Sequence, residues 1–246
     1  MKIERREKDF TLIRKTYDEV FDYSTLFTIN KLISEGTIDI LDFPIATGKE
    51  ANIFRGSVGD KFVAVKIFRV ATATFKNFLK YIVGDPRFKS ISHSHRELVY
   101  TWARKEYKNL VKLYDAGVIV PKPLRLYNNV LVMEYIGDET KAAPMLKDVK
   151  LRAKKKAYEK IIACIKKIYE DACMVHGDMS EYNILVNGDK FVYIDLAQAV
   201  VLKHPMAYEL LFRDIRNICR YFTKLGVKCD ANDIIEDVKR WKKCIT

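Results

Sequence analysis

One stretch of the chain, residues 175–195, restricts the possible folds more than any other. Two short apolar runs flank the Asn-Gly pair at 187–188, a pattern typical of a tight β-hairpin whose central turn residues have positive φ. A hairpin brings its two ends together, so we expect Asn183 and Asp195 to face the same place, with Asp178 on the loop before it. Three oxygen-bearing side chains at one place are the ligands that Mg²⁺ prefers when phosphates supply its remaining oxygens.

The same residues resemble the catalytic core of protein-kinase-like enzymes. There, a loop Asp addresses the attacking hydroxyl, a following Asn holds metal, and an Asp at a strand end holds metal over the ATP phosphates. His176-Gly177-Asp178 replaces the usual His-Arg-Asp, and Asp195-Leu196-Ala197 replaces Asp-Phe-Gly. The alternative is that the two Asp residues only cap a turn and a strand. The spacing of all three residues around a hairpin favours the catalytic interpretation.

Composition places the chain among folded proteins. Its 246 residues are 49% hydrophobic and 31% charged, and no apolar run approaches the roughly 18 residues of a membrane span. The first residues are too charged, and too mixed in sign, for a signal peptide. The five cysteines are odd in number and lack the close pairs of a zinc site, so we expect mostly packed, reduced thiols. These features predict a cytoplasmic protein without a membrane partner.

The net charge of +12 points to a polyanion, and by charge alone nucleic acid or an anionic membrane would both qualify. Part of this charge could equally serve ATP binding or solubility. The most basic stretch is the start of the helix expected at about 150–173, where a solvated face is the usual interpretation and an RNA-facing one the rarer.

The amino-terminal half predicts a small lobe that could cover ATP. A helical segment to about Gly36 precedes strands at 38–45, 52–57 and 62–68. The first two strands are joined by a small-residue turn, and its residues are Thr47, Gly48, Lys49, Glu50 and Ala51. Such a turn could meet phosphates with backbone N–H groups, although it lacks Gly-x-Gly-x-x-Gly and does not match a Walker A loop.

A buried ion pair is predicted between two elements of this half. Lys66 lies in an apolar strand, where a lysine is costly unless paired. Glu106 falls on the apolar face of a helix at about 95–110 and needs a cation in turn. A snorkelling lysine and a glutamate at the edge of a helix face are the ordinary alternatives. The long connection 69–96 is expected to be functional or partly disordered.

The rest of the chain predicts the second lobe. Strands at 118–120, 124–127 and 130–133 lead to a hinge at 134–137, whose backbone could bond adenine. Helices are expected at about 206–225 and after Asp230. The predicted fold is α+β and bilobal, like a protein kinase. Its divisions are residues 1–133 for the helical segment and antiparallel-sheet lobe, 134–137 for the hinge, and 138–246 for the mainly helical lobe. So little chain separates Asp195 from the next helix that the usual platform for peptide substrates is missing.

The combined motifs resemble the RIO family of atypical serine/threonine protein kinases, in particular its first subfamily in a short, archaeal-looking form. Thr47-Gly48-Lys49-Glu50-Ala51-Asn52 is similar to that family's phosphate turn. His176-Gly177-Asp178-Met179-Ser180-Glu181-Tyr182-Asn183 is similar to its catalytic loop, and Ile194-Asp195-Leu196-Ala197-Gln198 to its metal-binding segment. Trp102-Ala103-Arg104-Lys105-Glu106-Tyr107-Lys108-Asn109-Leu110 is similar to a helix of the first subfamily.

The resemblance implies a set of roles. Asp178 would be the catalytic Asp, and Asn183 and Asp195 would bind Mg²⁺ or Mn²⁺. Lys66 would contact the ATP phosphates and pair with Glu106, while Glu134 and Ile136 would present hinge backbone to adenine. The family autophosphorylates on serine, and members form a phospho-aspartate at the position of Asp195. Family members act in maturation of the small ribosomal subunit, so a precursor of that particle, with its RNA and proteins, is the expected partner. We expect a monomer.

Two other functions remain open from the sequence. Aminoglycoside- and choline-kinase-like enzymes also use His-Gly-Asp followed by Asn at the spacing of Asp178 and Asn183. Their cationic substrates favour acidic pockets, however, whereas this chain is basic. A non-catalytic scaffold that binds the ribosome is disfavoured because Lys66, Glu106 and the three site residues are all present.

Overall fold

The computed structural model describes residues 21–70, 75–88 and 94–241, and these divide into two compact units. The first unit contains the described residues up to 75, then 94–104 and 124–135. The second contains 76–88, 105–123 and 136–241. Most of the expected amino-terminal helical segment, residues 1–20, lies outside the described residues, and so do parts of the 69–96 connection. The division at a hinge of residues 134–137 stays a prediction.

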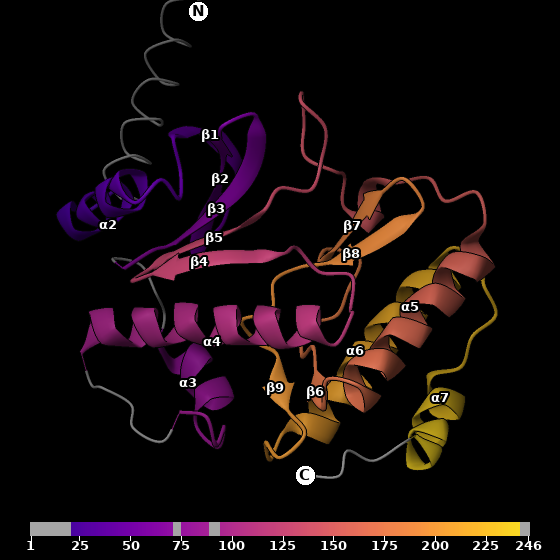
Figure 1. The fold of residues 1–246 in the computed structure, drawn as a ribbon. Helices are drawn as coiled ribbons and strands as arrows, with labels where there is room; N and C mark the ends of the chain where they lie inside the picture. The colour runs from indigo at the N-terminus through magenta and orange to yellow at the C-terminus, as the bar shows by residue number, and fades with distance from the viewer. Residues whose placement is uncertain (1–20, 71–74, 89–93, 242–246) are drawn as a thin grey trace, which may run out of the picture. The chain divides into compact units, whose positions relative to one another are not determined.

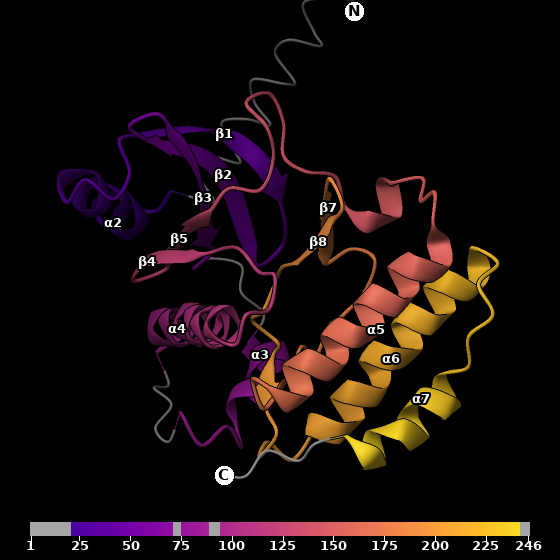
Figure 2. The same cartoon turned by 45° about the vertical axis from the view of Figure 1, so that its right-hand side comes forward.

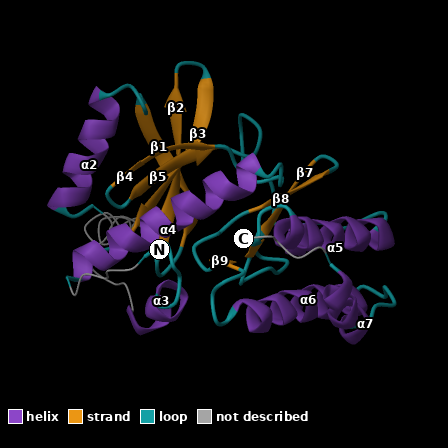
Figure 3. Ribbon diagram, turned by 60° about the horizontal axis from the view of Figure 1, so that its bottom comes forward, coloured by secondary structure: helices purple, strands orange, loops and turns teal. Residues whose placement is uncertain are grey.

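The first unit is built on a five-stranded sheet with the strand order β1-β2-β3-β5-β4 (Figure 1 and Figure 3). The pairs β1–β2, β2–β3 and β3–β5 are antiparallel. The strands are β1 (Ile40–Thr47), β2 (Ala51–Val58), β3 (Lys61–Phe68), β4 (Pro123–Tyr127) and β5 (Val130–Glu134). This sheet confirms the expected antiparallel small lobe.

Helix α2 (Tyr23–Ser34) supplies part of the core of this unit. It begins after Asp22, whose carboxylate accepts the N–H of Thr25 at 2.8 Å and so satisfies one of the unpaired donors of the first turn. Its buried Ile29 and Leu32 join one apolar cluster with side chains of the strands, among them Phe54, Val65 and Ile67. Because β3 is central in the sheet, its residues from Val63 onward are all buried.

The second unit is mainly helical. Helices α5 (Lys154–Glu170), α6 (Ala207–Lys224) and α7 (Ala231–Asp237) pack together in Figure 2, and α3 and the second half of α4 belong to the same unit. α3 spans Phe75–Ile82 and α4 spans His95–Asp115. Apolar residues at helical spacing on α5, Ile161, Ile165 and Ile168, are buried as their periodicity predicted. None of the helices among the described residues is long and apolar enough to span a membrane.

Short strands connect these helices and hold the residues of interest. β6 (Met174–Val175) pairs with β9 (Val200–Val201), and β7 (Ile184–Asn187) pairs with β8 (Lys190–Tyr193), both antiparallel. Single turns of 3-10 helix occur at Leu146–Asp148 and Val238–Arg240. Residues 196–206, without a long helix of their own, link Asp195 to α6, as the lack of a peptide platform in the sequence indicated.

Three local expectations were wrong. Residues 118–120 do not form a strand, although the Ile119 carbonyl accepts the N–H of Tyr193 at 2.9 Å. In the β7–β8 turn, Asn187 pairs with Lys190, so the central residues are Gly188 and Asp189, and of these only Gly188 has a positive φ, 59°. Cys173 is bonded in a disulfide, whereas Cys164, Cys219 and Cys229 are free thiols as expected.

Candidate active site

The loop that carries Asp178 follows β6 directly, and a glycine allows it to turn. Gly177 has φ of +78°, and a Cβ at this position would lie 2.7 Å from the carbonyl oxygen of Gln198. Both the backbone angle and the contact require glycine. This explains why Gly177 stands where protein kinases usually have arginine.

Asp178 and Asn183 are in direct contact. The Asn183 Nδ2 group donates to the backbone oxygen of Asp178 at 2.8 Å and to its carboxylate oxygen Oδ2 at 3.0 Å. Since both bonds need the amide nitrogen, the orientation of the Asn183 amide is fixed, and its Oδ1 atom points elsewhere. This oxygen is therefore the atom that Asn183 can offer to a cation.

The β7–β8 hairpin brings Asp195 to the same place, as the sequence predicted. Ile184 pairs with Tyr193, and the N–H of Ile194 donates to the Asn183 carbonyl at 3.0 Å, so Asn183 and Asp195 lie at the joined ends of the hairpin. Asp195 has φ of 60°, a left-handed conformation that costs a non-glycine residue about 1 kcal/mol or more. Such a conformation persists only where the surrounding structure holds it.

The charge of Asp195 affects the ionisation of Asp178. Burial raises the pKa of Asp178, and the negative charge of Asp195 raises it further, whereas Arg213 and the Asn183 hydrogen bond oppose the rise. A carboxylate with a raised pKa is better suited to accept a proton from an attacking hydroxyl.

His176 has a structural task beside these carboxylates. Its Nε2 atom is 3.1 Å from the Ile194 carbonyl, and its Nδ1 atom accepts the N–H of Asp178 at 3.3 Å. This pair of partners requires a neutral ring with the proton on Nε2. Burial accordingly lowers the pKa of His176 to about 4, although the Asp195 charge acts in the opposite direction.

Two residues of α6 that the sequence analysis missed form hydrogen bonds with the loop that carries Asp178. The buried carboxylate of Asp214 accepts the N–H of Gly177 and the N–H of Met179, both at 2.8 Å. Burial raises the pKa of Asp214 to about 7, even though both N–H bonds favour the charged form. Arg213 donates to the Gly177 carbonyl and lies 3.4 Å from the Gln198 amide oxygen. Asp214 could have been found from the sequence, because it is a charged residue on the apolar face of a helix, as Glu106 is.

The predicted phosphate turn lies in the first unit, between β1 and β2. The Gly48 N–H donates to the Ala51 carbonyl at 3.0 Å, the Glu50 carbonyl accepts the N–H of Arg69 at 2.9 Å, and Thr47 ends β1 opposite Asn52. Lys49 is exposed in this turn. Lys66 is buried on β3, opposite Ile53 and Leu131, with its ammonium 5.2 Å from the centre of the Phe68 ring. These contacts order the turn locally.

The remaining predicted residues divide between the units. Glu134 ends β5 in the first unit and pairs with Val63, whereas Glu106 is buried on α4 in the second unit. Ile136, also in the second unit, accepts the Ala143 N–H with its carbonyl at 2.9 Å. Because Lys66 and Glu106 belong to different units, their ion pair stays a prediction, and so does the ATP site that draws on both.

The donor atoms at the loop fit a divalent metal with oxygen ligands. The Asp195 carboxylate and the Asn183 Oδ1 atom are hard oxygen donors, the type that Mg²⁺ and Mn²⁺ take, and two protein ligands leave positions for phosphate oxygens and water. No group of three His, Cys, Asp or Glu side chains among the described residues forms another candidate metal site.

Comparison with known proteins shows the family of this chain. The profile of the RIO domain matches residues 52–234. The chain is 40% identical to the RIO-type serine/threonine-protein kinase Rio1 of Haloferax volcanii over 95% of its own length and 84% of that protein. It is 45% identical to the Rio1 kinase of Thermoplasma acidophilum, over 76% of its own length and 99% of that protein. The chain belongs to the RIO family of atypical protein kinases.

A solved structure shows the same fold in a more distant RIO kinase. The Rio2 kinase of Chaetomium thermophilum, described as an ADP/Mg²⁺-phosphoaspartate complex, has a TM-score of 0.70 and is 21% identical, covering 87% of this chain and 65% of that one. This likeness confirms the expected kinase-like fold, and the identity to the Rio1 kinases confirms the expected atypical kinase class. The aminoglycoside- and choline-kinase alternative and the scaffold alternative are not supported by these relatives.

Proposed function

We propose that this RIO kinase transfers the γ-phosphoryl group of ATP through Asp178, Asn183 and Asp195. The observation that carries the proposal is the contact of Asn183 with Asp178 at the end of a hairpin whose other end carries Asp195. With its raised pKa, Asp178 accepts the proton of the attacking hydroxyl. Asn183 Oδ1 and the Asp195 carboxylate hold Mg²⁺ or Mn²⁺, which when bound neutralises charge on the phosphate oxygens.

The other predicted residues bind the nucleotide in this proposal. Backbone N–H groups of residues 47–51 cover the phosphates, and Lys66, paired with Glu106, contacts them directly. The backbone of Glu134 and Ile136 bonds adenine. The burial of Lys66 and of Glu106 supports the pairing, because each charged group in an apolar surrounding needs an opposite charge.

We further propose that Asp195 itself receives the phosphoryl group. A carboxylate oxygen of Asp195 bonds to the γ-phosphorus while the bond from that phosphorus to the β–γ bridging oxygen breaks, and ADP leaves with the electron pair. Water then attacks the phosphorus and gives a proton to Asp178. The bond between the phosphorus and the Asp195 oxygen breaks, which restores the carboxylate and releases inorganic phosphate. The short link 196–206 supports this route, since it offers little for a peptide substrate to dock on. The phosphoaspartate named for the Rio2 complex agrees.

Turnover with γ-labelled ATP tests both steps. The enzyme is incubated alone, quenched in acid, and divided into samples with and without hydroxylamine. We expect release of free phosphate and a small amount of chain-bound label that hydroxylamine removes, as it does from an acyl phosphate. Label found only on serine, and stable to hydroxylamine, would exclude the phospho-Asp195 route and leave ordinary serine autophosphorylation. No label and no phosphate would exclude the phosphotransfer function.

The finer biological role is the maturation of the small ribosomal subunit in the cytoplasm, with the chain acting as a monomer. A basic cavity of about 550 Å³ between the start of α5 and the β7–β8 hairpin supports an RNA partner. Its lining includes Lys150, Arg152, Lys156 and Lys160. Lys160 donates to the Asp189 carbonyl at 3.3 Å. The other three cations form no hydrogen bond or ion pair with the residues that the structure describes. Cations in this state attract phosphate groups.

A further inference from the structure

The turn that follows Asp195 has buried backbone carbonyls that accept hydrogen bonds from side chains of another element. Residues 196–199 form a turn closed by the Ala199 N–H, which donates to the Leu196 carbonyl at 3.1 Å. Leu196, Ala197 and Ala199 are all buried, so their carbonyl groups cannot reach water. Buried carbonyls need donors from elsewhere in the protein, because an unpaired one costs about as much as a lost hydrogen bond.

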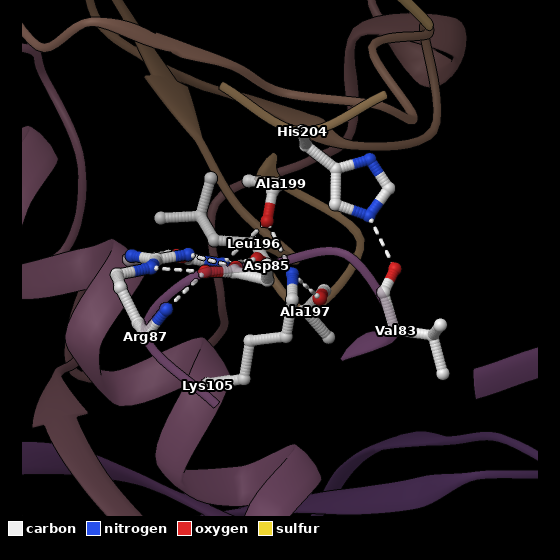
Figure 4. A network of polar contacts seen from close by, with 9 residues as sticks. Val83, Asp85, Arg87, Lys105, Leu196, Ala197, Ala199 and His204 are labelled. Atoms are coloured by element: carbon white, nitrogen blue, oxygen red, sulfur yellow. Dashed lines mark hydrogen bonds and ion pairs between the residues drawn. The ribbon is translucent and has the colours of Figure 1, made fainter. Parts of the chain in front are cut away.

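Helix α4 supplies these donors from two side chains. Lys105 donates its ammonium to the Ala197 carbonyl at 2.9 Å and to the Ala199 carbonyl (Figure 4). Asn109 donates its Nδ2 group to the Leu196 carbonyl at 2.7 Å and to the Ala199 carbonyl at 2.9 Å. The two residues are one helical turn apart, so they share a face of α4. Together they bind all three buried carbonyls of the turn.

A lysine is an expensive residue for this task. Lys105 is 0% exposed, and a long charged side chain is almost never buried fully unless it is paired or hydrogen-bonded. Burial lowers the pKa of Lys105 to about 7, and Arg87 lowers it too, whereas Asp85 and Glu106 favour the charged form. Asp85 is held in turn by Arg87 at 2.7 Å, and Figure 4 shows this pair beside Lys105. An apolar side chain would fill the space without the cost of burying a charge, but it would leave the Ala197 carbonyl without the donor that Lys105 supplies.

The turn connects this support to the carboxylates. Asp195 precedes it directly, in a left-handed conformation that its surroundings must maintain. Gln198 lies within it, and its Nε2 group is 3.4 Å from Asp178 Oδ2. Displacement of the turn would therefore move a proposed metal ligand and a neighbour of the proposed base at the same time.

We infer that Lys105 and Asn109 are positioning residues that fix the 196–199 turn and thereby orient the Asp195 carboxylate toward its metal. The inference rests on the proposed role of Asp195 as a ligand. Residues that orient a ligand typically change metal affinity or activity by about 10- to 100-fold when they are lost.

The test measures binding of Mn²⁺ in the presence of ADP, from the loss of the electron paramagnetic resonance signal of free Mn²⁺. Lys105→Met removes the donors and keeps the length of the side chain. Lys108→Met makes the same change at an exposed position of the same helix and serves as the matched control. We expect the Mn²⁺ dissociation constant to rise about tenfold or more for Lys105→Met, and to be unchanged for Lys108→Met.

Hydrogen exchange of the segment around 194–201 adds a readout of position. We expect faster exchange there in Lys105→Met at a temperature where circular dichroism shows both variants folded. If Lys105→Met does not fold, Asn109→Leu carries the test, since it removes the two hydrogen bonds from Asn109 to the same turn and leaves Lys105 in place. A folded variant with parental Mn²⁺ affinity and parental exchange overturns the inference.

Asp195→Asn separates this failure from failure of the proposed function. If Asp195→Asn binds Mn²⁺ as the parent does, Asp195 is not a ligand, and both proposals fail. If Asp195→Asn loses Mn²⁺ binding while Lys105→Met and Asn109→Leu retain it, the proposed function stands and the positioning role is wrong.

Discussion

At the scale of single residues, the proposed reaction depends on two carboxylates in different surroundings. The Asp178 carboxylate accepts a hydrogen bond from the Asn183 amide, and burial together with the charge of Asp195 raises the pKa of Asp178. Asp195 takes a left-handed backbone conformation two residues after the end of β8. The contrast predicts different tasks for the two, proton acceptance for Asp178 and metal binding with phosphoryl transfer for Asp195.

We therefore predict that Asp178→Ala and Asp195→Ala each lower ATP turnover by at least about 10²- to 10³-fold, because single electrostatic groups have effects of this size. Asp189→Ala, which removes an exposed carboxylate from the β7–β8 turn, is the control and keeps parental turnover. The measurement is release of labelled phosphate, with circular dichroism to confirm folding. Turnover within tenfold of the parent in both variants would show that the reaction occurs elsewhere.

The neutral ring of His176 predicts a loss of stability in acid. Its pKa is about 4 in the folded protein and about 6.5 in an unfolded chain. The unfolded state therefore binds a proton first as the pH falls, and the contribution of this group to stability is lost between about pH 6.5 and pH 4. Urea unfolding in EDTA at several pH values measures the change.

His176→Gln separates this effect from those of other titrating groups. Glutamine keeps a donor for the Ile194 carbonyl but does not titrate. We expect the free energy of unfolding to fall less steeply between pH 6.5 and pH 4 in His176→Gln than in the parent. Equal slopes would mean that His176 is not held neutral by the fold.

At the scale of elements, α6 holds the loop that carries Asp178 by hydrogen bonds. Its Asp214 accepts two backbone N–H groups from residues 177 and 179, and Arg213 donates to the Gly177 carbonyl. Both charged side chains belong to a helix whose other buried residues are mostly apolar. The loop thus obtains its donors and acceptors from a rigid element rather than from water.

We predict that Asp214→Asn lowers the free energy of unfolding by about 1 to 3 kcal/mol, because an amide offers one acceptor where the carboxylate offers two, and one buried N–H is left unpaired. Turnover falls in the same variant as the loop shifts. The matched control is Glu209→Gln, the same change at an exposed position of α6. Urea unfolding and labelled-ATP turnover measure the two effects, and a variant equal to Glu209→Gln in both would contradict the assigned support.

At the scale of the whole molecule, the net charge of +12 is the dominant property. The structure distinguishes among the lysines at the start of α5. Lys154 donates to the Leu225 carbonyl at 3.0 Å, and Lys155 lies 4.0 Å from Glu159. Lys150 and Lys156 line the basic cavity instead. An RNA partner should therefore depend on the second pair more than on the first.

We predict that the affinity for a small-subunit rRNA fragment falls steeply with salt, because bound phosphates release counterions. The double variant Lys150→Gln, Lys156→Gln reduces the slope of log affinity against log salt by about 1 to 2. The double variant Lys154→Gln, Lys155→Gln changes charge equally and has a smaller effect. A slope near zero in the parent would exclude an RNA partner, and equal slopes in both variants would exclude the cavity as its site.

Much of this protein was predictable because the deciding signals are local in sequence. Alternating and helical apolar patterns gave β2, β3, α5 and α6 close to their observed bounds, and Asp230 caps α7 as expected, accepting the Asn232 N–H at 2.8 Å. The hairpin signal placed Asn183 beside Asp195, since two strands joined by a short turn must meet at their ends. These local signals did not predict the exact turn residues of the hairpin, and they predicted a strand at 118–120 that does not form.

The supports of the site were decided only by the tertiary structure. Lys105 and Ala199, Asn109 and Leu196, and Asp214 and Gly177 are distant in sequence, and each pair meets because packed elements bring a donor to a buried acceptor. Periodicity shows that a polar residue falls on an apolar face, but it does not show which backbone group that residue satisfies. A hydrogen bond requires two groups to lie about 3 Å apart, and for groups far apart in the chain only the packing of the elements fixes that distance.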